Sequence, residues 1–344
     1  MNQTHVHIAY YFVLVSLSIS LIVLTIFLYR FCKKKPVESE ETLPIKLCAR
    51  AYLLTDIDAA TDGFNHRRIV GQGRLGTVYA GVLEEGEVVV AVKRILSRLV
   101  LSNAGFRFST MIKSLSFAQH PHIVPIIGYS EAPGERIIVM EFVGMASLDF
   151  YLHQNPDGAT LLDWSNRLKI AAGAARGLEY LHEGMTPNIV HGCVKASNIL
   201  IDVKFCARVS DYGLSFLASQ EKKGLMGYVD DEAGACKEND VYGFGVLLLE
   251  ILSGRLESEE KLLVKWALPL IKDMRFSELL DPRLVIPSDL NPFVRLAKAA
   301  SACVGNSRKS RPSMGQVAAI LNSLEMELNG KVGTGDFVLW TVNF

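Results

Sequence analysis

The chain has 344 residues, of which 49% are hydrophobic and 21% charged, enough to bury the core of one bilobal domain or of two ordinary ones. This composition excludes a disordered or fibrous protein. The chain has 36 lysine and arginine residues and 36 aspartate and glutamate residues, so its net charge is zero. No overall positive potential therefore favours an acidic substrate, and no nucleic-acid partner is expected.

The first predicted element is an uncharged apolar segment of 22 residues from Ile8 to Tyr29. A helix of this length crosses a hydrocarbon core of about 30 Å, and we predict a transmembrane helix over residues 8–30. The alternative is a cleaved signal peptide, which would need positive charge before a shorter apolar segment. Here Arg30 and three lysines at 33–35 follow the segment, which favours an uncleaved anchor.

The same basic residues predict the orientation of the anchor. Because positive charges collect on the cytoplasmic side, residues 1–7 are expected outside as a short extracellular N-terminus, and everything after the anchor is expected in the cytoplasm. The protein would then have almost no ectodomain, and the plasma membrane is the expected location. Residues 31–64 contain lysines, prolines and an acidic run, which predicts a cytoplasmic juxtamembrane segment.

Six cysteines are scattered along the chain without CxxC pairs or histidines at metal-ligand spacing: Cys32, Cys48, Cys193, Cys206, Cys236 and Cys303. Neither a zinc site nor a disulfide framework is predicted, and reduced thiols are expected. Cys32 lies beside the juxtamembrane lysines, where it is either a palmitoylation site or an ordinary interfacial residue.

The rest of the chain shows two successive patterns. Short β-branched runs separated by turns, such as residues 88–95 and 136–141, predict a small strand-rich lobe up to about Val143. Residues 167–182 and 241–252 have few helix breakers and the apolar content of buried helices. The predicted class is therefore α+β, with a strand lobe followed by a larger helical lobe.

A glycine-rich motif of the form GxGxxGxV lies between two predicted strands and comprises Gly71, Gly73, Gly76 and Val78. Without side chains, the backbone amides of such a loop can approach phosphate oxygens. Further along, Ala91 and Lys93 lie at the end of an apolar strand, from which the lysine can reach the phosphates of a nucleotide.

Two candidate metal ligands follow. Asn198 and Asp211, the latter within Ser-Asp-Tyr-Gly, occur at a spacing where both side-chain oxygens can bind Mg²⁺ held by the phosphates. With the glycine loop and Lys93, these residues resemble the protein kinase family, and the chain is most similar to plant receptor-like serine/threonine kinases. The resemblance extends from about Leu54 to Leu324.

The resemblance implies a bilobal protein-kinase fold over residues 65–328, with a C-terminal tail at 329–344. It also implies ATP and Mg as cofactors, although the departures described next indicate that both are weakly bound or lost. The expected nucleotide-binding residues are Gly71, Gly73, Gly76, Val78, Ala91 and Lys93, and the expected metal ligands are Asn198 and Asp211.

The catalytic loop departs from the family pattern His-Arg-Asp-Leu-Lys-x-x-Asn. Cys193 occupies the position of the catalytic base, Gly192 replaces the arginine, and Lys195 is retained. No acidic residue occurs between Glu183 and Asp202, so no carboxylate is expected to serve as catalytic residue. A thiolate at Cys193 could act as a base only if its pKa were lowered, for which Lys195 is the obvious neighbour.

Two further departures are independent of the first. In an active kinase the strand lysine pairs with a glutamate on the next helix, but that position is Met111, and no acid occurs between Glu87 and Glu131. In the activation segment, Leu225 replaces a threonine. We therefore expect Lys93 to lack its usual partner.

These departures predict a membrane-anchored receptor-like pseudokinase that acts as a scaffold or allosteric partner of an active receptor kinase or of a cytoplasmic signalling protein. The alternative is a weakly active ATP-dependent serine/threonine kinase, supported by the retained Lys93, Asn198 and Asp211. A domain that binds no nucleotide at all is also consistent with the unpaired lysine.

Overall fold

The computed structural model describes residues 48–83, 88–102, 107–144, 146–154, 161–218, 228, 235–257 and 262–332, together with four isolated helical positions, 16, 18, 20 and 24. The chain divides into two compact units, Met1–Leu47 and Cys48–Phe344. Within the described residues there is no helix that is both long and apolar enough to span a membrane. Apart from the four isolated positions, the predicted transmembrane segment lies outside the described residues.

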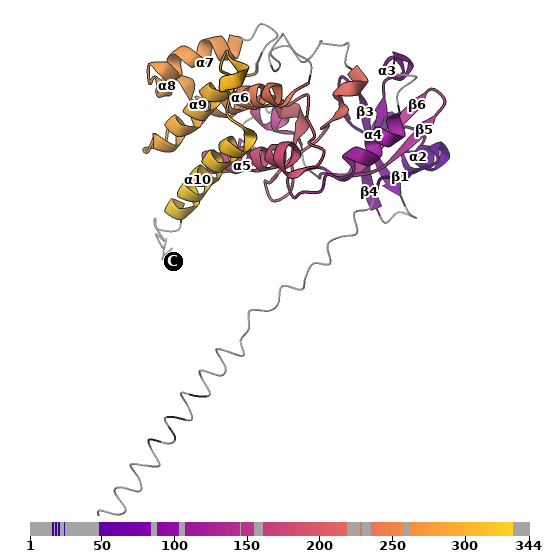
Figure 1. The fold of residues 1–344 in the computed structure, drawn as a ribbon, viewed down its shortest axis with the longest axis horizontal. Helices are drawn as coiled ribbons and strands as arrows, with labels where there is room; N and C mark the ends of the chain where they lie inside the picture. The colour runs from indigo at the N-terminus through magenta and orange to yellow at the C-terminus, as the bar shows by residue number, and fades with distance from the viewer. Residues whose placement is uncertain are drawn as a thin grey trace, which may run out of the picture. The chain divides into compact units, whose positions relative to one another are not determined.

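The second unit begins with a six-stranded sheet in the order β1-β5-β6-β4-β3-β2 (Figure 1). Only β1 pairs in parallel, with β5; the other pairs are antiparallel. The strands are β1 (Arg50–Ala51), β2 (Ile69–Gln72), β3 (Gly76–Leu83), β4 (Val88–Ile95), β5 (Ile126–Ala132) and β6 (Glu135–Glu141). The predicted runs at 88–95 and 136–141 form β4 and most of β6, because β-branched residues suit a pleated surface.

Alternate residues of the strands face two separate apolar clusters, as the period of two in a strand requires. On one face Val92 and Val139 pack with Ile57 of α2 (Leu54–Ala60). On the other, Ile138 packs in the cluster that contains Ile112 of α4 (Phe108–Leu115). A short helix, α3 (Ser97–Ser102), and the 3-10 turn η1 (His66–Arg68) complete this lobe.

The second lobe is helical (Figure 1). Its α-helices are α5 (Trp164–Glu179), α6 (Lys237–Ser253), α7 (Leu262–Lys272), α8 (Phe276–Leu279), α9 (Asn291–Cys303) and α10 (Met314–Val332). The π-helical turns η3 (Phe150–Gln154) and η4 (Tyr180–Gly184), the 3-10 turns η5 (Ala196–Asn198), η6 (Leu214–Ala218) and η7 (Arg308–Ser310), and the hairpin β7 (Ile199–Ile201) and β8 (Ala207–Val209) complete it.

Helix α6 is the central helix of this lobe. Every residue from Asn239 to Ser253 is buried, as expected for a helix that is apolar on all sides. The helix ends at Gly254, whose φ of +65° favours glycine. The predicted helices at 167–182 and 241–252 correspond to α5 with η4 and to α6, and the predicted strand lobe followed by a helical lobe is confirmed.

Candidate functional site

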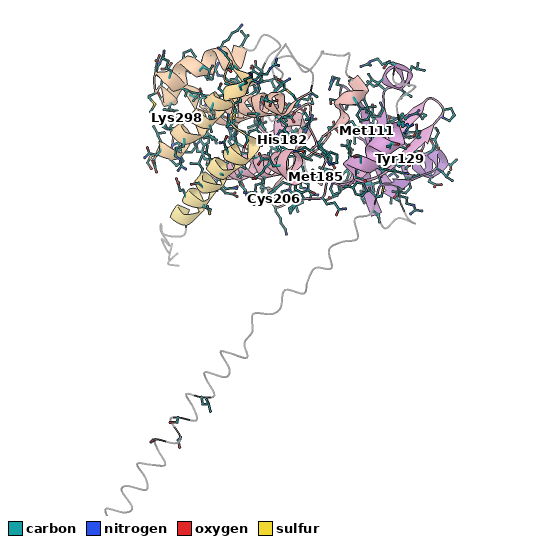
Figure 2. All side chains as sticks on the ribbon, in the orientation of Figure 1. Met111, Tyr129, His182, Met185, Cys206 and Lys298 are labelled. Atoms are coloured by element: carbon teal, nitrogen blue, oxygen red, sulfur yellow. The ribbon has the colours of Figure 1, made fainter. Side chains whose placement is uncertain are left out.

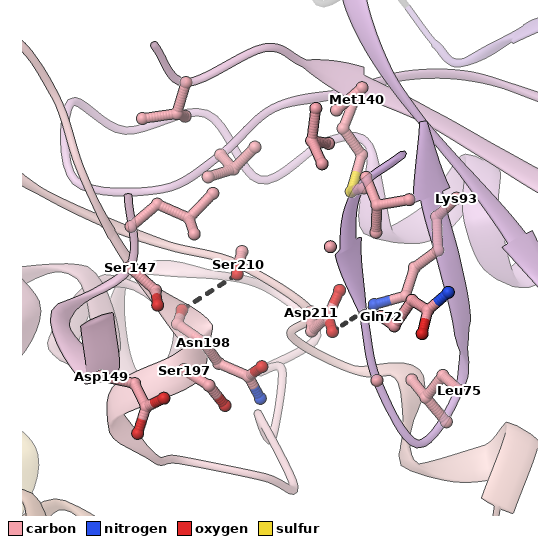
Figure 3. A pocket seen from close by; sticks show the side chains of 18 of the residues that line it. Gln72, Leu75, Lys93, Met140, Ser147, Asp149, Ser197, Asn198, Ser210 and Asp211 are labelled. Carbon is pink, nitrogen blue, oxygen red and sulfur yellow. Dashed lines mark hydrogen bonds and ion pairs between the residues drawn. The ribbon is translucent and has the colours of Figure 1, made fainter. Parts of the chain in front are cut away.

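A cleft of about 540 Å³ lies between the sheet and the helical lobe and is lined by residues from both (Figure 3). Seven of the eight predicted ligand-binding residues line it: Gly71, Gly73, Val78, Ala91, Lys93, Asn198 and Asp211. The exception is Gly76, which closes the glycine turn by accepting a hydrogen bond from the amide of Gly73 at 2.9 Å. A Cβ at Gly76 would collide with the carbonyl of Arg94, so glycine is needed there for strand pairing.

One end of the cleft is an apolar slot. Val78 of β3 and Ala91 of β4 line it from the sheet, and Leu200 of β7 lines it from the helical lobe. Met140 of β6 and, just after this strand, Phe142 and Val143 also contribute. These apolar residues and Leu200 were not predicted as site residues, because their side chains carry no chemical signal and only the folded arrangement brings them together.

At the polar end, the ammonium of Lys93 forms an ion pair with the carboxylate of Asp211, which lies in the turn after β8 (Figure 3). Lys93 is only 4% exposed. Met111, the residue at the position of the expected glutamate, is half-buried on α4 (Figure 2) and does not line the cleft. The lysine that would hold nucleotide phosphates therefore pairs with a residue that would hold a metal ion.

The second predicted metal ligand is held by the backbone around it. The side-chain amide of Asn198 donates to the carbonyl of Cys193 at 2.8 Å, and the backbone carbonyl of Asn198 accepts a hydrogen bond from the hydroxyl of Ser210 at 3.0 Å (Figure 3). Asn198 and Asp211 can each supply an oxygen to an Mg²⁺ ion whose other ligands would be phosphate oxygens and waters, but in this structure the carboxylate of Asp211 is paired with Lys93. The described residues contain no cluster of three or more His, Cys, Asp or Glu side chains suited to a metal ion.

Cys193 lies on the floor of the polar end, where the family pattern places the catalytic base. Burial raises the pKa of its thiol and outweighs the opposing effects of Lys195 and Arg74. Arg74, from the glycine turn, lines the same cleft as Cys193. Cys193 is thus a neutral thiol near pH 7, which argues against its use as a thiolate base.

The catalytic loop is held by Asp240 at the start of α6. Its carboxylate accepts hydrogen bonds from the amides of His191 and Gly192, both at 2.7 Å, and contacts the ring of His182 at 2.8 Å. Burial lowers the pKa of His191, so this residue is a neutral part of the core. The loop therefore keeps its support although it has lost its base.

Gly192, at the position of the family's arginine, has no room for a side chain. Its φ is +80°, and a Cβ there would lie 2.7 Å from the Cβ of Ser215 in η6. An arginine at this position would therefore require η6 to move. The activation-segment positions 225 and 230–232 lie outside the described residues.

Comparisons with known proteins agree with this arrangement. The protein tyrosine and serine/threonine kinase family matches residues 64–321. The chain is 37% identical over 304 residues to proline-rich receptor-like protein kinase PERK2 of Arabidopsis thaliana, covering 81% of the chain and 42% of that protein. It is 38% identical over 289 residues to leucine-rich repeat receptor protein kinase EMS1 of the same organism, covering 79% of the chain and 24% of that protein. The chain thus spans less than half the length of these relatives.

A solved structure is also similar. The pseudokinase domain of BIR2, an immune regulator of the RLK/Pelle family, superposes with a TM-score of 0.68 at 30% sequence identity, and the match covers 84% of this chain and 92% of that one. The similarity extends over both lobes, because it covers most of the second compact unit.

Proposed function

Because this chain belongs to the protein tyrosine and serine/threonine kinase family, we propose that it is a receptor-like pseudokinase that signals by binding other proteins. The relatives are receptor-like kinases, and a pseudokinase of the RLK/Pelle family has a similar fold. On this proposal the two lobes present a surface to an active receptor kinase or to a cytoplasmic signalling protein.

The proposal rests mainly on two features at the polar end of the cleft, the side chain at the position of the catalytic base and the partner of the strand lysine. Where a kinase uses a carboxylate to orient the substrate hydroxyl, Cys193 is a half-buried neutral thiol. Where a kinase holds its strand lysine with a helix glutamate, Lys93 pairs with Asp211. A positioned acid-base group contributes about 10²- to 10⁴-fold to a rate, and phosphate positioning often contributes more. The combined losses leave little phosphoryl transfer.

The membrane anchor is part of this proposal. We propose that residues 8–30 cross the plasma membrane, with the N-terminus outside and the kinase-like domain in the cytoplasm, because the segment is uncharged and basic residues follow it. Sharing a membrane with a receptor kinase raises the local concentration of the two partners, so a modest surface affinity suffices for a stable complex.

The competing function is a weak serine/threonine kinase. Its support is that Lys93, Asn198 and Asp211 line one cleft, as they would in an active enzyme. The same three residues are compatible with nucleotide binding that serves only to stabilise the folded domain. The two functions differ in whether Asp211, as a metal ligand, is needed for signalling.

Complementation tests the proposal. Cells that lack the protein are supplied with the wild-type chain or with Asp211→Asn, at matched membrane levels, and the downstream response is measured. Equal rescue by both is the expected result, since the function does not use phosphoryl transfer. Rescue by the wild type alone would contradict the proposal. Proximity labelling from the same two chains should recover the same active kinase partner.

A further inference from the structure

Glu250 lies fully buried in the central helix α6, away from the cleft. Its Oε1 accepts a hydrogen bond from the hydroxyl of Tyr228 at 2.5 Å and another from the backbone amide of Glu257 at 3.1 Å. Within the described part of the chain, its other oxygen, Oε2, has no hydrogen-bond partner. A buried carboxyl group either pairs with a cation or takes up a proton.

Cations near this site are bound to another carboxylate. Arg167 of α5 and Arg283, which follows α8, both donate to Asp281, at 2.6 Å and 2.7 Å. Among the residues that the structure describes, the one basic side chain within ion-pair distance of Glu250 is His153 of η3, whose Nε2 lies 3.8 Å from Oε1. The charge of Glu250 therefore depends on His153.

The ring of His153 also has an unfilled position. Its side chain is 7% exposed, and Nε2 has no hydrogen-bond partner among the described residues. Burial lowers the pKa of this ring, so it is neutral near pH 7 and can offer Nε2 as an acceptor. Burial also raises the pKa of Glu250 from 4.5 to about 8, so the carboxyl keeps its proton. One proton held between the two side chains gives each the hydrogen bond that it lacks.

Two further carboxylates oppose a negative charge on Glu250. Asp149, just before η3, and Glu257, after α6, repel such a charge and add to the effect of burial on the pKa of Glu250. The hydroxyl of Tyr228 acts in the opposite direction, but burial outweighs it. The protonated carboxyl is therefore the form that suits the closed site.

Tyr228 covers Glu250 from the activation segment. Its backbone carbonyl lies against Gly243, two turns earlier in α6, where an added Cβ would lie 3.1 Å from that oxygen. Glu257 is only 6% exposed and the side chain of His153 7%, whereas Tyr228 is half-buried. Water therefore reaches Glu250 most directly past Tyr228.

We propose that Tyr228 is a proton-controlled latch, which stays on α6 while Glu250 and His153 hold one proton and opens when that proton passes to water. The reason is linkage. An open latch hydrates Glu250, and a hydrated carboxyl binds its proton more weakly than the buried one does, so alkaline pH favours the open latch. The latch uses no phosphoryl transfer and is independent of the pseudokinase function.

The test is hydrogen exchange of the full chain in detergent micelles, measured by mass spectrometry in the peptide that contains Tyr228 and corrected for the intrinsic rate at each pH. The protection of this peptide should fall by about tenfold per pH unit between about pH 5 and pH 7 and level off above about pH 8. At every pH it should stay well below the protection of the core of α9, because the latch opens without global unfolding.

Two variants separate the parts of the latch. Glu250→Gln has a similar shape but no proton to lose, so the protection around Tyr228 should no longer depend on pH. His153→Phe keeps a ring but removes the acceptor, so the pH at which protection levels off should fall by about one unit, a tenfold loss of proton affinity. Glu278→Gln, at the surface, is the matched control and should behave as the wild type does.

Three results would overturn the inference: protection in the wild type that does not depend on pH or equals that of α9, a pH dependence that persists in Glu250→Gln, or an unchanged levelling-off in His153→Phe. Thermal unfolding at pH 6 identifies a variant that has failed to fold. The pH series of the wild type and the remaining variant then decide the outcome.

Discussion

Lys93 and Asp211 lie 118 residues apart in the sequence and form an ion pair between β4 and the turn after β8. Each has the side chain that an active kinase would turn toward the nucleotide, one for phosphate and one for metal. The pair forms where α4 offers Met111 and no carboxylate. Both the expected phosphate-binding residue and one of the expected metal ligands are therefore engaged with each other at the polar end of the cleft.

Restoring the catalytic carboxylate alone should not restore activity. Cys193→Asp replaces a neutral thiol with a carboxylate but leaves Lys93 paired with Asp211. It also leaves Ser215 in the space that a side chain at residue 192 would need. Phosphate transfer from ATP to a generic protein substrate should therefore stay at the background of the wild-type chain. Robust transfer by this single variant would show that the base was the only missing part. Cys206→Asp, in the same lobe, is the control for an added charge.

The support of the catalytic loop by Asp240 should be measurable by hydrogen exchange. Asp240→Ala removes the acceptor of the amides of His191 and Gly192. Exchange at these two amides should accelerate by about tenfold or more while the core of α9 stays protected. Asp273→Ala changes an exposed aspartate and should leave both amides as they are. Unchanged exchange in Asp240→Ala would contradict the assigned role.

A buried arginine in α5 should matter for stability. Arg167 is fully buried and donates to Asp281 and to the carbonyl of Ile251, both at 2.6 Å. Arg167→Ala removes the donor to the carbonyl of Ile251 and leaves Asp281 with the partly exposed Arg283 as its partner, so it should lower the free energy of unfolding by about 3 kcal/mol. The urea midpoint of the full chain measures this.

The matched control is Arg275, whose ion pair with Glu278 is on the surface. Arg275→Ala should shift the urea midpoint far less, because exposed pairs contribute little. Equal shifts in Arg167→Ala and Arg275→Ala would contradict the assignment of the buried pair.

The raised pKa of Glu250 leads us to expect that the stability of the fold depends on pH. It is fully buried in α6, beside Tyr228, Glu257, Asp149 and His153, and burial raises its pKa from 4.5 to about 8. A carboxyl whose pKa is raised on folding contributes stability below the unfolded pKa of 4.5, and this contribution is lost as pH rises toward about 8. The loss has a slope of up to about 1.4 kcal/mol per pH unit.

Glu250→Gln should remove this dependence. The variant should gain stability relative to the wild type as pH rises from 5 toward 8, and the amide oxygen can still accept the hydrogen bond that Tyr228 donates to Glu250 at 2.5 Å. Thermal unfolding across that range measures the difference. Glu278→Gln, at the surface, provides the reference. Parallel curves for Glu250→Gln and the wild type would contradict the raised pKa.

Local patterns in the sequence predict several of the main elements and seven residues of the cleft lining. The β-branched run at 88–95 forms β4, and the largely apolar run at 241–252 forms part of α6, because both signals depend on periodicity and burial. Seven of the predicted ligand-binding residues converge in one cleft, because the spacing of their motifs reflects the fold. Gly76 does not line the cleft, because its lack of a side chain is what allows β3 to pair with β4 at Arg94.

The missed features depend on tertiary contacts. The absence of an acid near Met111 indicates a lost partner but cannot show that Asp211 replaces it. The presence of Arg74 and Cys193 in one cleft depends on how the glycine turn lies relative to the catalytic loop. Ser215 leaves no room for a side chain at residue 192, and its position depends on η6, a turn with no distinct sequence signal.

The most direct test of the account is phosphoryl transfer by the purified full chain. The transfer of labelled γ-phosphate from ATP, with Mg²⁺ and with Mn²⁺, is measured to the chain itself and to generic substrates, with Asp211→Asn as reference. If the chain is a pseudokinase, transfer by the wild type and by Asp211→Asn is indistinguishable. Transfer by the wild type that is lost in Asp211→Asn would show an active kinase and contradict the pseudokinase assignment.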